Sequence, residues 1–505
     1  MPKKQNLLGL TVKKEEDFPE WYHQVLTKAE LISYHDISGC YVLRPNAFEI
    51  WEFIQQYLDK EFKKNGVRNA YFPLFISKKS LEKEKEHLDD FSPEVAWITK
   101  AGDKTLENEI AIRPTSETIM YEYFKDWLKS HRDLPMKYNQ WCNVVRWEFK
   151  DPTPFIRSRE FLWQEGHTAH MTEEEAEEQV MTSLDLYTKL YEEVLCVPVF
   201  PGQKTKKEKF AGADYTTTIE AFIPETGRGI QAGTSHMLGQ NFAKMFNIQY
   251  EDPTELGKKN HVYQTSWGVT TRSIGTMIMT HADNIGMVLP PKVAFCQVII
   301  VPTGMNKKTT EDVKEKLFQL CRDYEAVLNE AGIRCQCDLR ETYSPPWKYN
   351  YWEMRGVPLR LEIGPREIEA GTATFVNRVT MEKTTNEVTV KNIQDILKHI
   401  STLLYENAQK KVVEATGSAT NIDEMAKLVQ SKKMVCAPFC GEIECENNLK
   451  EQMNKMEGCQ GTKSLCVPHA QYVMLMVGLG SIDLKCVNPN CEIMCTDITM
   501  FGKSY

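Results

Sequence analysis

Two runs near the middle of the chain combine charges and aromatic rings in an order suited to binding a nucleoside triphosphate. The first is Arg146-Trp147-Glu148, and the second is Arg157-Ser158-Arg159-Glu160-Phe161-Leu162-Trp163-Gln164-Glu165-Gly166-His167. Arginine can clamp a phosphate through two parallel hydrogen bonds, and an aromatic ring can stack on a base. The sequence contains no Gly-x-x-x-x-Gly-Lys-Ser/Thr loop and no set of protein-kinase motifs. It therefore predicts that arginines, and not a glycine-rich loop, hold bound ATP.

A second group of reactive side chains lies near the C-terminus. Eight of the fifteen cysteines crowd between Cys436 and Cys495. The pairs Cys440-x-x-x-x-Cys445 and Cys486-x-x-x-x-Cys491 resemble two knuckles of a Cys₄ zinc site. Cys495 competes with Cys491 for the fourth position. A set of reduced buried thiols is the alternative interpretation, because disulfides are rare in a reducing compartment.

Length, charge and the distribution of apolar residues limit the classes of protein to which the chain can belong. The 505 residues are enough for two to four domains with sizeable cores. A net charge of −9 argues against a protein that coats nucleic acid, although a local basic face would suffice for a specific RNA. No apolar run approaches the roughly 20 residues that span a bilayer. The first residues carry no apolar segment of a secretory signal, so a cytoplasmic protein without a membrane partner is expected.

The elements that must position these residues follow from periodicity. A helix is predicted over 47–64, strands over 69–75 and 136–149, and a helix over 173–195 that Thr172 caps. Strands return over 216–231, and Pro290-Pro291 marks a boundary. Beyond it, strands over 294–301, 334–339, 359–363 and around 375–376 alternate with helices over 310–331 and from 392. We therefore expect three domains, covering 1–290, 291–403 and 404–505.

Further motifs connect the central runs to a known family. Arg113-Pro114-Thr115-Ser116-Glu117-Thr118, Gln231-Ala232-Gly233-Thr234-Ser235-His236 and Thr270-Thr271-Arg272 accompany them in the sequence. Jointly these motifs resemble the class II aminoacyl-tRNA synthetases, and in detail the prolyl-tRNA synthetases of the eukaryotic and archaeal-like type. The resemblance covers essentially the whole chain, including the terminal Phe501-Gly502-Lys503-Ser504-Tyr505. It implies an α+β catalytic domain with an antiparallel sheet, then an α/β anticodon-binding domain and a small C-terminal zinc-type α/β domain.

The resemblance also implies roles for individual residues. Arg146 and Arg272 would be catalytic, and Gln231 would contact the Mg²⁺ that accompanies ATP. The ATP-binding set would be Arg146, Glu148, Arg157, Ser158, Phe161, Gln231, Thr234, Thr270 and Arg272. The proline-binding set would be Phe91, Thr115, Ser116, Glu117, Arg146, Trp163, His167 and His236. The zinc-type tail would direct Tyr505 toward the catalytic domain.

The implied activity joins L-proline to tRNA(Pro) at the expense of ATP. Three runs combine cationic, aromatic and turn residues at expected strand ends, a mix that suits unpaired, stacked bases: Asp338-Leu339-Arg340, Ser344-Pro345-Pro346-Trp347-Lys348 and Gly356-Val357-Pro358-Leu359-Arg360. Contacts to tRNA are therefore expected from Arg340, Lys348 and Arg360, for which surface salt bridges are an equal alternative. A homodimer is expected. Only residues 168–230 separate the second run from the Gln231 motif, so the large editing insertion of bacterial relatives is expected to be absent. Because the chain starts close to the catalytic domain, we also expect no fused synthetase or editing domain before it.

Two rival functions remain open at this point. A sister synthetase for threonine, serine, glycine or histidine would share the fold. Thr115, Glu117 and the Trp163-x-x-x-His167 pair disfavour threonine, since no thiol or histidine cage for a catalytic metal accompanies them. A synthetase-derived RNA-binding regulator would have no physical reason to retain Arg146, Glu148 and Arg272 together.

Overall fold

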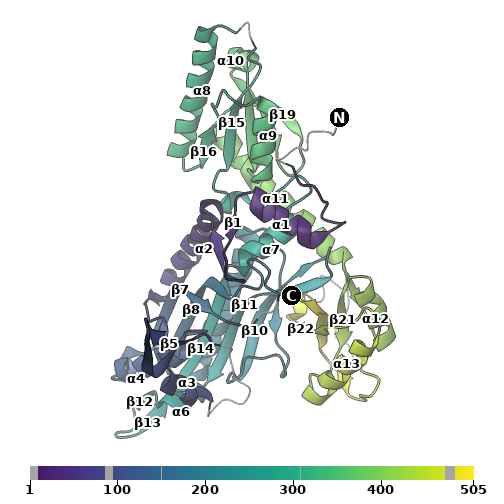
Figure 1. Cartoon of the computed structure of the whole chain (residues 1–505). Helices are drawn as coiled ribbons and strands as arrows, with labels where there is room; N and C mark the ends of the chain where they lie inside the picture. The colour runs from purple at the N-terminus through teal and green to yellow at the C-terminus, as the bar shows by residue number, and fades with distance from the viewer. Residues whose placement is uncertain (1–8, 86–94, 149–150, 307–308, 473–483) are drawn as a thin grey trace.

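The computed structural model describes residues 9–85, 95–148, 151–306, 309–472 and 484–505. A large twisted sheet forms the centre of the molecule, a smaller α/β domain lies at one end, and the C-terminal residues continue the large sheet at its side (Figure 1). Among the described residues, no helix is long and apolar enough to cross a membrane.

The large sheet has eleven strands in the order β20-β21-β25-β22-β9-β10-β11-β14-β8-β7-β3. Its central strands, from β9 to β7, pair antiparallel. This agrees with the antiparallel catalytic sheet expected from the sequence. The strands of the catalytic part are β3 (Arg68–Asn69), β7 (Met136–Val145), β8 (Glu160–His170), β9 (Phe200–Gln203), β10 (Tyr215–Ile223), β11 (Arg228–Gly239) and β14 (Tyr263–Thr270).

Four helices cover one face of this sheet, and a cavity opens on the other face. One apolar core joins Trp267 and Val269 of β14 to residues of the covering helices. These helices are α1 (Phe18–Lys28), α2 (Pro45–Lys64), α5 (Glu173–Lys189) and α7 (Arg272–His281). Thr172 caps α5 by accepting a hydrogen bond from the backbone of Glu175, as predicted. The helix continues as a π-helical turn, η2 (Leu190–Val194).

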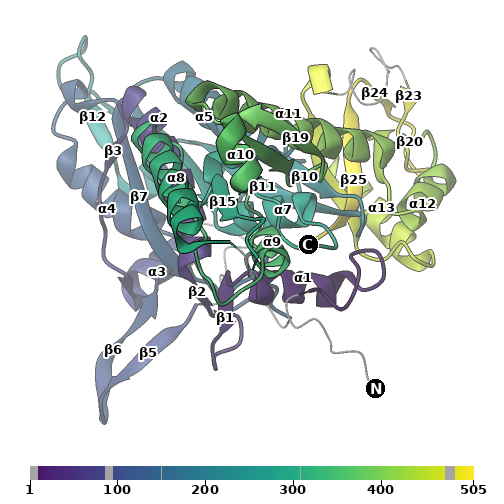
Figure 2. The ribbon, with the colours of Figure 1, turned by 90° about the horizontal axis from the view of Figure 1, so that it is seen from above.

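The remaining elements of the catalytic part pack beside the sheet. A second apolar core brings Tyr121 and Phe124 of α4 (Glu117–Trp127) against Phe242 of α6 (Asn241–Phe246). The β5–β6 hairpin projects away from the body (Figure 2). Smaller elements are β1 (Ile32–Tyr34), β2 (Tyr41–Leu43), β4 (Phe75–Ser77), α3 (Lys78–Lys85), β5 (Trp97–Ala101), β6 (Lys104–Ile112), η1 (His131–Asp133), β12 (Gln249–Glu251) and β13 (Lys259–His261).

The strand predicted over 69–75 is wrong. The structure ends β3 at Asn69 and starts β4 at Phe75, and the two strands belong to different sheets. Pro73 lies between them. Proline has no backbone N–H to donate to a strand ladder, which explains the interruption.

The second domain is a five-stranded mixed sheet in the order β16-β15-β17-β18-β19. The first three strands are parallel and the last two antiparallel, which agrees with the predicted α/β domain. Its elements are η3 (Pro291–Val293), β15 (Val298–Pro302), α8 (Glu311–Glu330), β16 (Cys335–Cys337), α9 (Pro345–Met354), β17 (Leu359–Ile363), α10 (Pro365–Ala370), β18 (Thr372–Asn377), β19 (Lys383–Glu387) and α11 (Val390–Glu414).

Two details of this domain differ from the expectation. Residues 344–348, expected at a strand end, instead begin helix α9, with Ser344 at its N-cap and Pro345 in its first turn. Proline suits that position because its fixed φ is already helical. Helix α11 runs without interruption across the boundary predicted at 403/404 and carries the chain into the C-terminal residues.

Strands β20, β21, β22 and β25 of the C-terminal residues extend the catalytic sheet, whereas β23 and β24 pair with each other in a separate two-stranded sheet. Pro468 on β22 pairs with Gly202 on β9, and Ser504 on β25 pairs in parallel with Gly229 on β11. The end of the chain therefore lies beside β11 (Figure 1). The elements are β20 (Thr416–Ser418), α12 (Ile422–Gln430), β21 (Met434–Pro438), α13 (Ile443–Lys455), β22 (Thr462–Pro468), β23 (Leu484–Lys485), β24 (Met494–Cys495) and β25 (Ile498–Ser504).

Candidate active site

A cavity of about 600 Å³ opens on the sheet face opposite the covering helices. It brings together most of the residues predicted to bind ATP and proline. They are Thr115, Glu117, Arg146, Glu148, Ser158, Phe161, Trp163, His167, Gln231, Thr234, His236, Thr270 and Arg272.

Two predicted residues within the described chain do not line this cavity. Ser116 lies behind it and donates backbone and side-chain hydrogen bonds to Glu165. Arg157 lies in the turn before β8, where its backbone N–H donates to Thr153. Phe91 falls outside the described residues.

Strand register decides which side chains share the cavity. On β8, Trp163, Glu165 and His167 are alternate residues and so point to one face. They pair with Thr270, Gly268 and Ser266 of β14. Gly268 contributes no side chain, so the cavity reaches the backbone of β14 between its two ends.

Arg146 is held in a fixed orientation at the mouth of the cavity. Its guanidinium lies over the rings of Phe161 and Trp163, with the carbon Cζ 5.7 Å and 5.3 Å from their centroids. Its Nε donates to the carbonyl of Pro114 at 3.0 Å. Stacking on the rings and this hydrogen bond leave the outer nitrogens of the guanidinium to face an anion.

Arg272 is a second arginine that lines the cavity. Arg272 is the first residue of α7, and its Nε donates to the carbonyl of Ile156 at 3.0 Å. Its Nη1 donates to the carbonyl of Gln231 at 3.1 Å. Burial, together with the positive charge of Arg146, lowers the pKa of Arg272. Two guanidiniums that repel each other in one cavity favour a bound anion.

Glu165 organises the inner part of the cavity, and the sequence analysis assigned it no role. Its carboxylate accepts hydrogen bonds from Gln140 at 3.1 Å, from His167 Nε2 at 3.0 Å and from Ser116. Burial alone would raise the pKa of Glu165, but the hydrogen bond and charge of His167 lower it. Its place between Trp163 and His167 in the strand alternation could have identified it.

The pKa of His167, the hydrogen-bond partner of Glu165, shifts in the opposite direction. Burial would lower the pKa of His167, but the hydrogen bond to Glu165 and the charges of Glu117 and Glu165 raise it. The other ring nitrogen, Nδ1, lies 3.0 Å from the hydroxyl of Tyr121. One carboxylate oxygen from each of Glu117 and Glu165 and one ring nitrogen of His167 all lie within 4.8 Å of one another. The group therefore forms a compact, partly charged wall.

The opposite wall is neutral. Burial lowers the pKa of His236 to about 3, and the charges of His167 and Arg146 act in the same direction. Its Nδ1 lies 2.9 Å from the hydroxyl of Thr216, and its ring lies 4.9 Å from that of Phe210. Phe210 also lines the cavity but was not predicted, because only the folded chain brings residues 210 and 163 together.

C-terminal residues close a third side of the cavity. Lys463, Leu465, Ser504 and Tyr505 line it. Tyr505 donates from its hydroxyl to Thr226 at 3.2 Å, and Arg228 donates to the carbonyl of Ser504 at 3.1 Å. These contacts agree with the expectation that Tyr505 is directed toward the catalytic domain.

Comparisons with known proteins identify the family. A model described as "tRNA synthetase class II core domain (G, H, P, S and T)" matches residues 98–281, and "Anticodon binding domain" matches 297–400. "Prolyl-tRNA synthetase, C-terminal" matches 422–505. A relative from Arabidopsis thaliana named "Proline--tRNA ligase, cytoplasmic" is 51% identical over 93% of this chain and 87% of its own length. The chain belongs to the prolyl-tRNA synthetase family.

Two further matches place the chain within this family. A crystal structure of prolyl-tRNA synthetase from Cryptosporidium parvum, complexed with halofuginone and AMPPNP, superposes with a TM-score of 0.92. It is 48% identical, and the match covers 99% of this chain and 100% of that one. The bifunctional glutamate/proline–tRNA ligase of Drosophila melanogaster is 50% identical over 100% of this chain. The chain spans only 30% of that protein's length.

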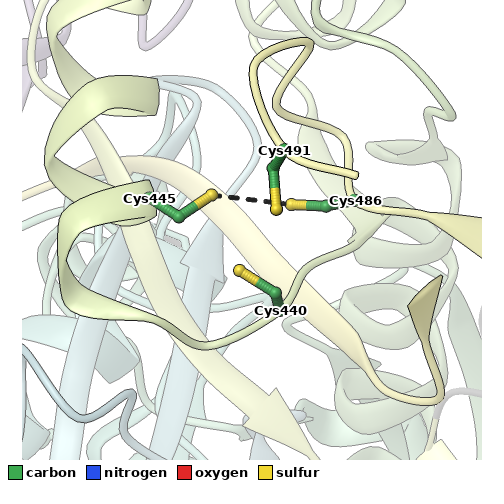
Figure 3. Close-up of side chains that lie close together, drawn as sticks. All are labelled: Cys440, Cys445, Cys486 and Cys491. Atoms are coloured by element: carbon green, nitrogen blue, oxygen red, sulfur yellow. Dashed lines mark hydrogen bonds between the residues drawn. The ribbon is translucent and has the colours of Figure 1, made fainter. Parts of the chain in front are cut away.

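Four of the C-terminal cysteines converge on one point (Figure 3). The sulfur atoms of Cys440, Cys445, Cys486 and Cys491 all lie within 4.8 Å of one another. Cys445 and Cys486 are 3.7 Å apart, and the amide nitrogen of Asn488 donates to the Cys445 sulfur at 3.1 Å. Cys495 is not in this group, and its thiol donates to the carbonyl of Ile493 at 3.6 Å.

The three cations predicted to contact tRNA have different surroundings. The ammonium of Lys348 is buried and donates to the carbonyl of Asp338 at 2.8 Å. Arg360 is buried between Glu353 and Glu362. Arg340 retains 39% of its side-chain exposure, although it also pairs with Asp338. Its guanidinium lies over the rings of Tyr343, Trp347 and Tyr351.

These three rings form a stacked series on one side of α9. Tyr343 stacks on Trp347 with 3.7 Å between ring centroids, and Trp347 stacks on Tyr351 with 5.1 Å. We name Arg340, Tyr343, Trp347 and Tyr351 the aromatic ladder. The motif Ser344-Pro345-Pro346-Trp347-Lys348 pointed to part of it, but the helical spacing that aligns the rings was missed.

The opposite pKa shifts of Glu165 and His167 predict how their contribution to stability depends on pH. The contribution of His167 is fully present below its ordinary pKa of 6.5 and is lost as pH rises through the raised value. We expect the stability difference between the wild type and His167→Gln to shrink from pH 6 to pH 9. The difference in the free energy of unfolding should change by on the order of 1 kcal/mol for a tenfold change in the proton affinity of His167. Midpoints of thermal unfolding at each pH measure this change.

His236→Asn is the matched control for this experiment. His236, with a pKa of about 3, is neutral throughout that range, so its difference from the wild type should stay constant. A His167→Gln difference that is equally constant from pH 6 to pH 9 would contradict the raised pKa.

Proposed function

We propose that the chain activates L-proline with ATP and transfers it to tRNA(Pro). The observation that carries this proposal is the single cavity in which Arg146 and Arg272 face the slot formed by Glu117, Trp163 and His167. An anion site beside a carboxylate-rimmed aromatic slot suits a nucleotide and a cyclic amino acid. The names of the relatives, and the AMPPNP in the Cryptosporidium parvum complex, support the same activity.

In the first step the carboxylate oxygen of proline attacks the α-phosphorus of ATP. The bond from this phosphorus to the bridging oxygen breaks, and pyrophosphate leaves with the electron pair. Arg146, fixed by its two rings and Pro114, would stabilise the negative charge that develops on the α-phosphoryl oxygens. Arg272 would hold the nucleotide from the other face. No residue forms a covalent intermediate, so positioning and electrostatics supply the rate.

The base and phosphate tail of ATP would use the remaining cavity residues. Phe161 would stack on adenine, and Glu148 would accept from its amino group. Ser158, Thr234 and Thr270 offer hydroxyls around the nucleotide, and Arg157 would reach the phosphate tail. Mg²⁺ bound with ATP neutralises the β- and γ-phosphates, and the side-chain oxygen of Gln231 suits such a hard cation.

Proline would lie in the slot beyond the α-phosphate. Thr115 and Glu117 would accept hydrogen bonds from its secondary ammonium. The rings of Trp163, His167, His236 and Phe210 would wall its methylenes, and the neutral form of His236 avoids repulsion of the ammonium. Ser116 would act indirectly, because it holds Glu165 in place. A hydrophobic slot rejects a smaller side chain weakly, by about 1–3 kcal/mol per methylene, so alanine is expected to react slowly.

The second step would transfer the prolyl group to the terminal ribose of tRNA. A ribose hydroxyl attacks the carbonyl carbon of prolyl-adenylate, and AMP leaves. The aromatic ladder of the second domain would bind unpaired anticodon bases, because stacked rings with an arginine suit splayed bases. Arg340 supports this role through its exposure. Lys348 and Arg360 would contact tRNA only after they leave their ion pairs, which Lys348 forms with Asp338 and Arg360 forms with Glu353 and Glu362.

The four clustered cysteines fit a structural zinc ion. A tetrahedral Zn²⁺ with Zn–S bonds of about 2.3 Å has sulfur–sulfur edges of about 3.8 Å, close to the 3.7 Å between Cys445 and Cys486. The donor of Asn488 to Cys445 would favour its thiolate. We therefore propose Cys491, and not Cys495, as the fourth ligand, with a role in holding the C-terminal strands.

We also propose that the chain forms a homodimer and lies in the cytoplasm. Exposed aromatic side chains lie on β4, β5 and α4 and on the segment before β4, and such a set suits a homodimer contact. They are Tyr71, Phe75, Trp97, Tyr123 and Trp127. A cytoplasmic location rests on the name of the Arabidopsis thaliana relative.

The activity is tested by ATP–pyrophosphate exchange with each of the twenty amino acids. We expect the strongest exchange with proline and weaker exchange with alanine. Arg146→Ala should reduce proline-dependent exchange about 10²- to 10³-fold, since it removes a donor to the transition state. Arg132→Ala, an exposed arginine outside the cavity, is the control. Folded wild type without any exchange would instead favour a regulatory RNA-binding protein.

The anticodon proposal is tested by Trp347→Ala. Loss of one stacking ring should raise the KM for tRNA(Pro) in aminoacylation by about 5- to 100-fold, while proline-dependent exchange stays unchanged. Phe48→Ala, an exposed aromatic on α2, should leave both values as they are. An unchanged KM in Trp347→Ala would remove the aromatic ladder from the anticodon site.

The zinc proposal is tested by metal analysis of purified protein. We expect about one zinc per chain in the wild type and in Cys495→Ser, and almost none in Cys440→Ser or Cys491→Ser. Cys459→Ser, a buried cysteine outside the cluster, controls for the loss of a thiol. Retention of zinc in Cys491→Ser together with its loss in Cys495→Ser would reverse the assignment of the fourth ligand.

A further inference from the structure

Helix α1 contacts the wall of the cavity through one buried side chain. Tyr22 is 3% exposed, and its hydroxyl donates to the carbonyl of Pro154 at 3.0 Å. The two residues are 132 positions apart in the sequence, and neither of them lines the cavity itself. Burial raises the pKa of Tyr22 well above its ordinary value, so the hydroxyl keeps its proton and stays a donor at neutral pH.

Pro154 belongs to a tight turn that runs from Thr153 to Arg157. The backbone N–H of Thr153 donates to the carbonyl of Arg157 at 2.9 Å. The N–H groups of Ile156 and Arg157 donate to the carbonyl of Thr153 at 3.1 Å and 2.8 Å. Within the turn Phe155 has a φ of +65°, in the left-handed region that residues with a side chain rarely adopt. Such a conformation persists only where the surrounding structure holds it.

This turn forms part of the cavity wall and holds Arg272. Phe155 and Ile156 both line the cavity. The carbonyl of Ile156 accepts the hydrogen bond from Nε of Arg272 at 3.0 Å. Because the guanidinium is planar and rigid, this bond also sets the direction of its outer nitrogens. A displacement of the turn would therefore displace Arg272, whereas Glu117 and His167 of the proline slot lie on other elements, α4 and β8.

Helix α7 packs directly against the same turn. Gly275 lies three residues after Arg272, so both residues face the same side of the helix. A Cβ atom at Gly275 would lie 2.7 Å from Cδ1 of Ile156, 2.9 Å from Cβ of Phe155 and 3.1 Å from the hydroxyl oxygen of Tyr22. All three distances are shorter than an ordinary contact. The missing side chain of Gly275 therefore allows α1, the turn and α7 to meet.

We propose that Tyr22 is a positioning residue for the nucleotide, whose hydroxyl holds the turn at Pro154 so that the carbonyl of Ile156 fixes Arg272 before ATP binds. An arginine that is already ordered loses less conformational freedom when the triphosphate arrives. The alternative is a buried tyrosine that only stabilises the fold. This inference rests on the proposed function, which supplies the nucleotide, and it concerns how that nucleotide is held.

Tyr22→Phe tests this role because it removes the hydroxyl and keeps the ring. Calorimetry without proline gives the Kd for Mg-ATP, and pyrophosphate exchange gives the KM values for ATP and L-proline. We expect both ATP values to rise about tenfold, since a buried carbonyl of the turn loses its donor. The KM for L-proline should stay unchanged. Gly275→Ala is a second variant that displaces the turn by contact, and it should raise both ATP values in the same way.

Tyr250→Phe is the matched control. Tyr250 is also a buried tyrosine whose hydroxyl donates to a backbone carbonyl, that of Met171 at 3.2 Å, but it lies on β12 outside the cavity. This variant should lower the midpoint of thermal unfolding, as Tyr22→Phe does, and leave both ATP values at those of the wild type.

Unchanged ATP values in folded Tyr22→Phe and Gly275→Ala would overturn the inference and leave Tyr22 a purely structural role. Equal rises in the KM values for ATP and L-proline would also overturn it, because they would indicate general damage to the site. A wild type that binds Mg-ATP but shows no exchange with L-proline would instead reject the proposed function. The calorimetric comparison would still test the role of Tyr22 in that case.

Discussion

The antiparallel register of β11, β14 and β8 is the constraint on which the site depends. Side chains alternate between the two faces of a strand, so a shift by one residue would exchange the cavity face for the core face. In the observed register Trp163, Glu165 and His167 meet Thr270, Gly268 and Ser266. The intervening residue Trp267 packs into the helix-covered core, where its ring lies 4.9 Å from that of Phe62. Burial of that core face fixes the register and therefore the site.

The cavity separates charge along its length, and this separation determines where each substrate can bind. Arg146 and Arg272 make one end cationic, so it favours phosphate. Glu117 and Glu165 make the adjacent wall anionic, but His167 and Ser116 partly neutralise Glu165. In the proposed binding mode, a secondary ammonium would therefore meet the carboxylate of Glu117, while the charge of Glu165 is already compensated. In the same arrangement Arg146 carries a positive charge and His236 is neutral, because burial and the nearby positive charges lower the pKa of His236.

The C-terminal residues belong to the active site through the continuity of the sheet. Strand β25 pairs with β11 and ends at Ser504, which precedes Tyr505 on the cavity wall, while β22 pairs with β9. The cysteine cluster lies where α13 and the loop after β23 approach each other, so it ties residues 440–445 to 486–491. Helix α11 connects these strands to the second domain. Glu225 of the catalytic part also connects two other segments of the chain, because it forms ion pairs with Lys14 near the N-terminus and with Lys411 of α11.

The sequence by itself predicted which residues come together in the candidate site, and it predicted much of the local structure. Residue types and spacing identified the two arginines, the aromatic slot and the cysteine pairs, and Thr172 marked the start of α5. Such signals are local, because caps and periodicity act over a few residues. Pro73 also acts locally, yet its effect on the strand over 69–75 was overlooked.

Only the tertiary structure decided which distant segments meet. It placed Phe210 and Tyr505 on the cavity, buried Lys348 and Arg360 in ion pairs, and brought Cys491 to the cluster in place of Cys495. It also brought Tyr22 against the turn that holds Arg272. Each of these outcomes depends on strand register and packing between residues far apart in the chain, which no local pattern encodes.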